Sequence, residues 1–141
     1  MTNQQHLLLD IEGTTCPVSF VSDVLFPFAK KELSRYITQH WIKSPHNKPI
    51  QAARKEWLDD QSAESMKIKQ QVMQGKTREV DGLIQYLKHL IGIDRKSTAL
   101  KDLQGKIWEY GYNNGDLKSQ LFPETAECLH QWHEQGLTLS V

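Results

Sequence analysis

The order of apolar and polar positions along the chain predicts a short strand, a series of helices and a second strand. Residues 6–11 (HLLLDI) form a nearly continuous apolar run, which is typical of a strand buried on both faces of a parallel sheet. Over residues 18–41 the apolar positions recur every three or four residues, which predicts an amphipathic helix. Pro27 lies inside this helix, so we expect a kink or a new helix start there. The turn-forming residues 43–49 should close this part of the chain.

The middle of the chain is predicted to be helical. Residues 49–74 indicate one or two exposed helices, in which Ala52, Trp57 and Leu58 are the candidate buried positions. Further helices are expected over residues 77–94, with Gly92 as a possible stop, and over residues 97–116, which end in an Asn-Asn-Gly-Asp turn. Their apolar stripes consist of Val80, Leu83, Ile84, Leu87, Leu90 and Ile91 in the first helix, and Leu100, Leu103, Ile107 and Trp108 in the second.

The end of the chain returns to a strand. Residues 122–136 predict a helix with Pro123 at or near its first turn and Gly136 as its C-terminal stop. Residues 137–141 (LTLSV) have the composition of a strand. Because parallel strands need a crossover connection, we expect an α/β fold with a long helical insertion after the first strand. Two strands alone do not complete such a sheet.

Composition narrows the class of protein. The 141 residues are enough for one domain, and 17 basic residues balance 17 acidic ones, so no net charge favours nucleic acid or an anionic membrane. The two cysteines, Cys16 and Cys128, lie too far apart to form a metal motif and are too few for a disulfide framework, which favours reduced thiols. We find no leader-like start and no apolar run of membrane-spanning length. We therefore expect a soluble, cytoplasmic protein.

Two carboxylates lie at the carboxyl end of the first predicted strand. Asp10 and Glu12 lie where ligands bind in open α/β sheets, beyond the carboxyl end of a strand, and their spacing places both side chains on one side of an extended chain. Gly13 lets the backbone approach a ligand, while Thr14 and Thr15 add hydroxyls and exposed N–H groups. This pattern predicts a pocket for a phosphoryl group and a divalent cation, with one carboxylate as nucleophile and the other as general acid and base. The alternative is a turn selected only for its conformation.

The same residues resemble a known family. Residues 7–15 (LLLDIEGTT) resemble the first motif of haloacid-dehalogenase-like phosphatases, with Glu12 at the second acidic position. Residues 16–29, 103–125 and 129–141 resemble, more narrowly, the enolase-phosphatase E1 family, which forms the acireductone of methionine salvage. The resemblance implies a Rossmann-like α/β core, of which this chain holds the first two strands, with a large inserted helical cap.

The resemblance also implies roles for individual residues. Asp10 would be the nucleophile and a ligand of Mg²⁺, the expected cofactor, and Glu12 would be the general acid and base with its backbone carbonyl facing the metal. Gly13 and Thr14 would support the motif and the phosphoryl group. The substrate would be a small phosphorylated diketone, 2,3-diketo-5-methylthiopentyl-1-phosphate, which is enolised and dephosphorylated. The family further implies a monomer without nucleic-acid or membrane partners.

The resemblance divides the chain into three parts. Residues 1–19 would hold the first core strand and the catalytic loop, residues 20–120 the helical cap, and residues 121–141 the return helix and second core strand. The family's later Ser/Thr motif, its Lys and its further acidic pair would follow Val141, so we expect a truncated enzyme with an incomplete magnesium site and little turnover. The alternatives are another phosphomonoesterase of the same superfamily and an inert fragment or a folded cap that only binds.

Several polar and aromatic residues remain weaker candidates. Lys101, Gln104 and Trp108 could face the substrate from the cap, although packing between helices is the favoured role of Trp108. His130 and His133 have a spacing that can bind zinc on a helix face. Without a third ligand nearby in the sequence, a solvated helix surface is the favoured interpretation for this pair.

Overall fold

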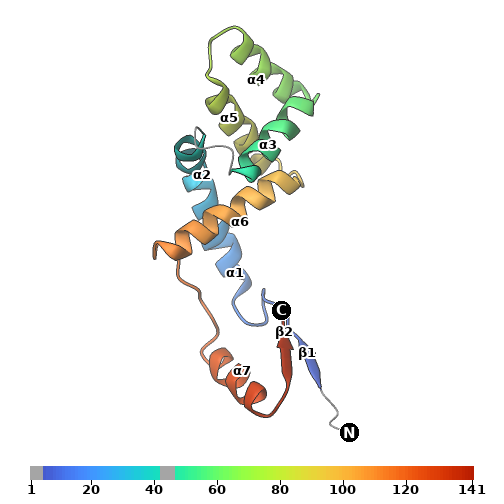
Figure 1. Cartoon of the computed structure of the whole chain (residues 1–141), viewed down its shortest axis with the longest axis vertical. Coiled ribbons are helices and arrows are strands. Elements are labelled where there is room, and N and C mark those ends of the chain that lie inside the picture. Colours follow the sequence, from blue (N-terminus) through green and yellow to red (C-terminus); the bar gives the residue numbers. More distant parts are fainter. Residues whose placement is uncertain (1–4, 42–46) are drawn as a thin grey trace. The chain divides into compact units, whose positions relative to one another are not determined.

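The computed structural model describes residues 5–41 and 47–141, and the chain divides into two compact units (Figure 1). The first unit combines residues 1–27 with residues 117–141, and the second spans residues 28–116. Most of the predicted turn over residues 43–49 lies outside the described residues. No helix among the described residues is both long enough and apolar enough to cross a membrane.

The first unit is built on a parallel pair of strands. Strands β1 (His6–Leu8) and β2 (Thr138–Ser140) pair in parallel, with Leu7 opposite Leu139. One further backbone bond extends the pair, since the Leu9 N–H donates to the Ser140 carbonyl at 2.8 Å. All the other described elements lie between these two strands in the sequence, so the expected α/β order with a long helical insertion is confirmed.

The expected burial of the first strand on both faces is wrong for this structure. The Leu8 side chain is 78% exposed, and Leu7 is only half-buried. Among the described residues each strand has only the other as its neighbour, so the sheet has two open edges. Apolar side chains that a wider sheet would cover therefore meet solvent.

Helical structure begins just after the loop that follows β1. The short helix α1 (Val18–Phe20) continues into a π-helical segment, η1 (Val21–Leu25), and then into α2 (Phe26–His40). The Phe26 N–H donates to the Val21 carbonyl, five residues earlier, and α2 starts immediately before Pro27. Proline has no N–H to donate, and the irregularity expected near Pro27 takes the form of a π-helical segment just before it, within helical backbone that is continuous from Val18 to His40.

Helix α7 (Thr125–Glu134) returns the chain to the sheet and contacts β2. It ends as predicted at Gly136, whose φ of +87° is the left-handed conformation that glycine adopts most easily. The Gly136 N–H donates to the His133 carbonyl and the Leu137 N–H to the Trp132 carbonyl, at 3.0 and 3.1 Å. These two bonds form a Schellman motif, which pairs carbonyls of the last turn.

The second unit is a helical assembly. It contains most of α2, followed by α3 (Lys48–Asp59), α4 (Ala63–Met73), α5 (Glu79–Gly92) and α6 (Thr98–Asn113). The stretch predicted as one or two exposed helices thus forms two, α3 and α4. All five helices contribute to one hydrophobic core, which consists of Ala29, Leu33, Ile37, Ile50, Ala53, Trp57, Ile68, Val80, Leu83, Ile84, Tyr86, Leu87, Leu90, Ala99, Leu100, Leu103 and Ile107.

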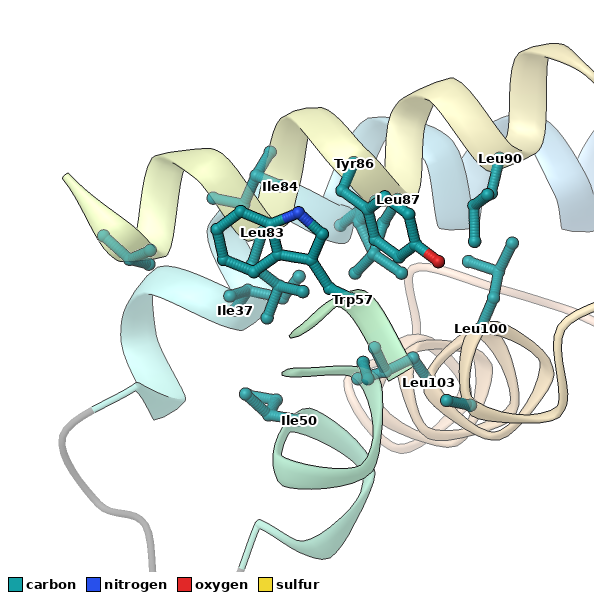
Figure 2. Packing of buried hydrophobic residues seen from close by; sticks show 14 of the residues in the cluster. Ile37, Ile50, Trp57, Leu83, Ile84, Tyr86, Leu87, Leu90, Leu100 and Leu103 are labelled. Atoms are coloured by element: carbon teal, nitrogen blue, oxygen red, sulfur yellow. The ribbon is translucent and has the colours of Figure 1, made fainter. Parts of the chain in front are cut away.

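The buried face of α3 differs from the predicted one. Trp57 is buried as expected, but Ala52 is exposed and Leu58 is 44% exposed. The residues that join Trp57 in the core are Ile50 and Ala53 (Figure 2). These three residues share one helix face, whereas Ala52 and Leu58 lie on opposite sides of it, each about one residue, roughly 100°, from its neighbour in the core.

The stripes of α5 and α6 are confirmed, and α5 packs unusually closely. Gly82 on α5 is buried, and a Cβ atom added there would lie 2.8 Å from Trp57 Cη2 and 2.9 Å from Val72 Cγ2. Figure 2 shows the indole of Trp57 beside the ring of Tyr86, and the two ring centroids are 6.3 Å apart. The predicted residues of both stripes are buried except Ile91 and Trp108, which are half-buried and pack against the core.

Candidate active site

The two predicted catalytic carboxylates lie together in the loop that follows β1. We call residues 10–16 the acidic loop; it starts two residues after β1 and ends one residue before Pro17, which precedes α1. Asp10, Glu12 and Thr14 are all exposed. The Asp10 carboxylate is oriented locally, because its Oδ1 accepts a hydrogen bond from the Ile11 N–H at 2.8 Å.

The Ile11 carbonyl organises the acidic loop. It accepts hydrogen bonds from the N–H groups of Thr14, Thr15 and Cys16 at 3.3, 3.0 and 3.2 Å. The Thr15 hydroxyl donates to the same oxygen at 3.1 Å. The Gly13 N–H donates to the Cys16 carbonyl at 2.8 Å, which folds the loop back on itself.

This pattern corrects one expectation and confirms another. The N–H groups of Thr14 and Thr15 are not free for a ligand, because the tight turn uses them to pair the Ile11 carbonyl, and Thr15 is buried. Gly13 has the special backbone expected of it, with a φ of +73°. An added Cβ at Gly13 would also lie 3.1 Å from Val18 Cγ2. Gly13 therefore supports the shape of the motif, and the Thr14 hydroxyl remains a candidate contact for a phosphoryl group.

The acidic loop is attached to the segment that leads into α7. The Thr15 carbonyl accepts the Phe122 N–H at 3.0 Å and the Thr125 hydroxyl at 3.3 Å. Thr15 and Thr125 are both buried. The roles of Phe122 and Thr125 could not be predicted from any local pattern, because the two threonines lie 110 positions apart in the sequence.

The donor set of the acidic loop suits a magnesium ion in type but not in number. The Asp10 carboxylate and the Glu12 backbone carbonyl are oxygen ligands, which Mg²⁺ prefers, but its octahedral shell has six positions. Across residues 5–41 and 47–141 no group of three or more His, Cys, Asp or Glu side chains could hold a metal ion. His130 and His133 are exposed, as expected of a solvated helix surface.

The three candidate substrate-facing residues of the cap occupy different environments on α6. Lys101 is exposed, Gln104 is buried, and Trp108 is half-buried against the hydrophobic core of the second unit. The contact of Trp108 supports the packing role favoured for it. A substrate-facing role of Lys101 and Gln104 stays a prediction.

A surface cavity of about 540 Å³ lies elsewhere, in the second unit, and none of the predicted site residues lines it. Its lining consists of Ser34, Thr38, Lys76, Thr77, Arg78, Asp81, Ile84 and Gln85. Arg78 there is already paired with Asp81, at 2.6 Å. The acidic loop, which combines exposed carboxylates with a fixed backbone, therefore remains the candidate active site.

Comparison with known proteins gives the chain a set of close relatives. No family model matches it. The enolase-phosphatase E1 of Synechococcus sp. strain CC9605 is 84% identical over 99% of this chain and 56% of its own length. Those of Parasynechococcus marenigrum and Pseudomonas syringae pv. tomato are 52% and 42% identical over 96% of this chain, and over 56% and 52% of their own lengths. This chain thus spans just over half the length of these relatives.

A solved structure has a similar fold. The crystal structure of the UTR4 protein (Unknown transcript 4 protein) of Saccharomyces cerevisiae matches with a TM-score of 0.58 and 26% sequence identity. The match covers 92% of this chain and 48% of the yeast protein. The order of strand, helical insertion, return helix and strand described above is therefore that of a known fold.

Proposed function

The chain belongs to the enolase-phosphatase E1 family, and we propose that it supplies the nucleophile and the general acid and base of a phosphomonoester hydrolase in methionine salvage. The observation that carries this proposal is the exposed Asp10–Glu12 pair, held at the carboxyl end of β1 by a tightly hydrogen-bonded loop. The proposed substrate is 2,3-diketo-5-methylthiopentyl-1-phosphate. It is first enolised, by loss of a proton from C1 and protonation of the C2 carbonyl oxygen, and hydrolysis of the resulting phosphomonoester gives the acireductone and inorganic phosphate.

The chemistry assigns one role to each carboxylate. Asp10 attacks the phosphorus atom and forms an aspartyl-phosphate, while the bond between phosphorus and the substrate oxygen breaks. Glu12 donates a proton to the departing oxygen and then accepts a proton from the water that hydrolyses the aspartyl-phosphate. The Ile11 N–H bond to Asp10 Oδ1 restricts the nucleophile to one orientation, which lowers the entropic cost of the attack.

Magnesium is the proposed cofactor. The Asp10 carboxylate and the Glu12 carbonyl would hold it, together with water molecules or phosphate oxygens of the substrate. When bound, the ion would neutralise charge on the transferring phosphoryl group. We further propose a cytoplasmic monomer whose partner is the small phosphorylated diketone, without nucleic acid or membrane partners.

Phosphate release tests the proposal directly. The chain is incubated with magnesium and either the diketo-phosphate or a generic phosphomonoester, and compared with Asp10→Asn, Glu12→Gln and a control, Asp23→Asn, which removes an exposed carboxylate of η1. We expect slow phosphate release, faster from the diketo-phosphate than from the generic phosphomonoester. Asp10→Asn should abolish this release, whereas the control variant should release phosphate at the rate of the unmodified chain. Equal release by Asp10→Asn and the unmodified chain would refute the role of Asp10.

Binding without turnover is the second candidate function. It is favoured by the small donor set, since the acidic loop offers two metal ligands and no described cluster adds a third acidic side chain. Titration of the chain with the diketo-phosphate, followed by NMR of the loop amides, separates the two candidates. Shifts of those amides without phosphate release would indicate binding alone.

A further inference from the structure

We propose that Thr125 is a positioning residue for the acidic loop, a role that rests on the proposed phosphatase function. Its hydroxyl and the Phe122 N–H both donate to the Thr15 carbonyl, at 3.3 and 3.0 Å. The carbonyl oxygen has two lone pairs, so the two donors fill its capacity. One backbone atom of the loop is thereby held by two groups from the far end of the sequence.

Burial makes this attachment more than a surface contact. Thr125 is 9% exposed and Thr15 is 8% exposed, so water has little access to replace the bond between them. A buried hydroxyl or carbonyl that loses its partner pays a desolvation penalty. The backbone of Thr125 is held as well, because its N–H donates to the Phe122 carbonyl at 3.0 Å. The backbone that carries this hydroxyl is therefore held in place at Thr125, the first residue of α7.

A continuous series of hydrogen bonds leads from Thr125 to the nucleophile. Thr15, held by Thr125, donates both its N–H and its hydroxyl to the Ile11 carbonyl, at 3.0 and 3.1 Å. Ile11 lies between the two carboxylates, and its N–H donates to Asp10 Oδ1 at 2.8 Å. Loss of the Thr125 hydroxyl should therefore loosen the backbone of residues 10–12, which carries both carboxylates. Thr125 does not contact the reacting atoms itself.

The first test measures amide hydrogen exchange in the full chain. Thr125→Val removes the hydroxyl and keeps the side-chain shape, whereas Thr125→Ser keeps the hydroxyl. Thr138→Val is the control, because it makes the same change at a half-buried position of β2. In Thr125→Val we expect exchange at Thr15, Cys16 and Phe122 to be faster by about tenfold, the factor for one buried hydrogen bond. Thr125→Ser should stay within about twofold of the unmodified chain, and Thr138→Val should leave these amides unchanged.

The second test measures phosphate release. Thr125→Val should lower kcat by about tenfold with little change in KM, because the loop loses its geometry in the transition state and not its access to substrate. Thr125→Ser should restore kcat. A chain without turnover would refute the proposed phosphatase function, whereas the exchange experiment would still decide whether Thr125 holds the loop.

Three results would overturn the positioning role. The first is unchanged loop exchange in Thr125→Val. The second is a Thr125→Ser variant as defective as Thr125→Val, which would show that the hydroxyl is not the group that matters. The third is unfolding of Thr125→Val, or faster exchange throughout β1, β2 and α7, since the hydroxyl would then stabilise the whole unit and not the loop.

Discussion

Removal of the Tyr86 hydroxyl should destabilise the second unit by an amount that follows from its contacts. Tyr86 is fully buried on α5, and its hydroxyl donates to Asp60 Oδ2 at 2.8 Å. The Asp60 side chain is 5% exposed and also forms an ion pair with Arg95. Its other oxygen, Oδ1, accepts the Ser62 N–H at 2.7 Å, just before α4 begins. Asp60 thus joins α5 to the connection between α3 and α4.

The magnitude can be worked from this geometry. Tyr86→Phe keeps the ring, which stacks against Trp57, so no large cavity forms and the apolar burial is retained. The substitution removes one hydrogen bond to a charged group, which contributes about 1.5–3 kcal/mol. Arg95 and Ser62 still pair the Asp60 carboxylate, so it is not left as an isolated buried charge. We therefore expect a loss of about 2 kcal/mol in the free energy of unfolding at pH 7.

The stability of this unit should depend on pH with a definite sign. Burial raises the pKa of Asp60, but hydrogen bonds from Ser62, Tyr86 and Arg95 outweigh it and hold this pKa well below its ordinary value. Burial, and then the bond to Asp60, raise the pKa of Tyr86, so the phenol remains a donor at neutral pH. A lowered carboxyl pKa stabilises the fold above the unfolded pKa of about 4, and this stabilisation is lost as pH falls toward the folded pKa. Tyr86→Phe should weaken that dependence only where pH approaches the folded pKa.

Urea unfolding followed by tryptophan fluorescence measures both quantities. The unmodified chain, Tyr86→Phe and a control, Tyr110→Phe on α6, are compared at pH 7 and pH 3. We expect Tyr86→Phe to lie about 2 kcal/mol below the unmodified chain at pH 7. The difference should persist at pH 3, where the folded Asp60 is still ionised, while both proteins lose stability because the carboxyl of the unfolded chain becomes protonated. A difference within about 0.5 kcal/mol at pH 7 would refute the role assigned to this hydrogen bond.

Two glycine positions yield further predictions, measured by the same urea unfolding. Gly82→Ala should cost about 1–3 kcal/mol, because its Cβ would lie 2.8 Å from the buried Trp57 ring. Gly92→Ala is the matched control, since an added Cβ there meets no atom within 4 Å; an equal loss in both variants would contradict the steric argument. Gly136→Ala should cost about 1 kcal/mol through its φ of +87° alone, as nothing lies within 4 Å of an added Cβ. An unchanged unfolding midpoint for Gly136→Ala would show that the Schellman motif tolerates a side chain.

Local chemistry explains what could be predicted from the sequence. Periodicity identified the strands and helices, because the apolar positions of an amphipathic helix recur every three or four residues and those of a strand follow one another closely. Both patterns are visible within a single element. Local backbone chemistry identified the helix irregularity near Pro27 and the stop at Gly136, which depend on a missing N–H and a missing Cβ. The placement of Asp10 and Glu12 just beyond a strand followed in the same way. These features need no knowledge of what packs against them.

The buried face of α3 shows where such reasoning fails. Ala52 and Ala53 are neighbours of identical chemistry, and only the packing of the other helices selects Ala53 for the core. The same holds for Leu58, which is more apolar than Ala53 yet 44% exposed. The apolar residues of a short helix limit which of its faces can be buried, but they do not select one of these faces. Burial is a property of the assembled unit.

The sequence by itself determined the elements of this protein, their order and the residues of its acidic motif. Only the tertiary structure decided how that motif is held. The Thr15 carbonyl meets the Thr125 hydroxyl across 110 residues of sequence, and the loop turns its own amides inward onto the Ile11 carbonyl. The physical reason is that a hydrogen bond depends on distance and angle in space, whereas a sequence pattern records only neighbours along the chain.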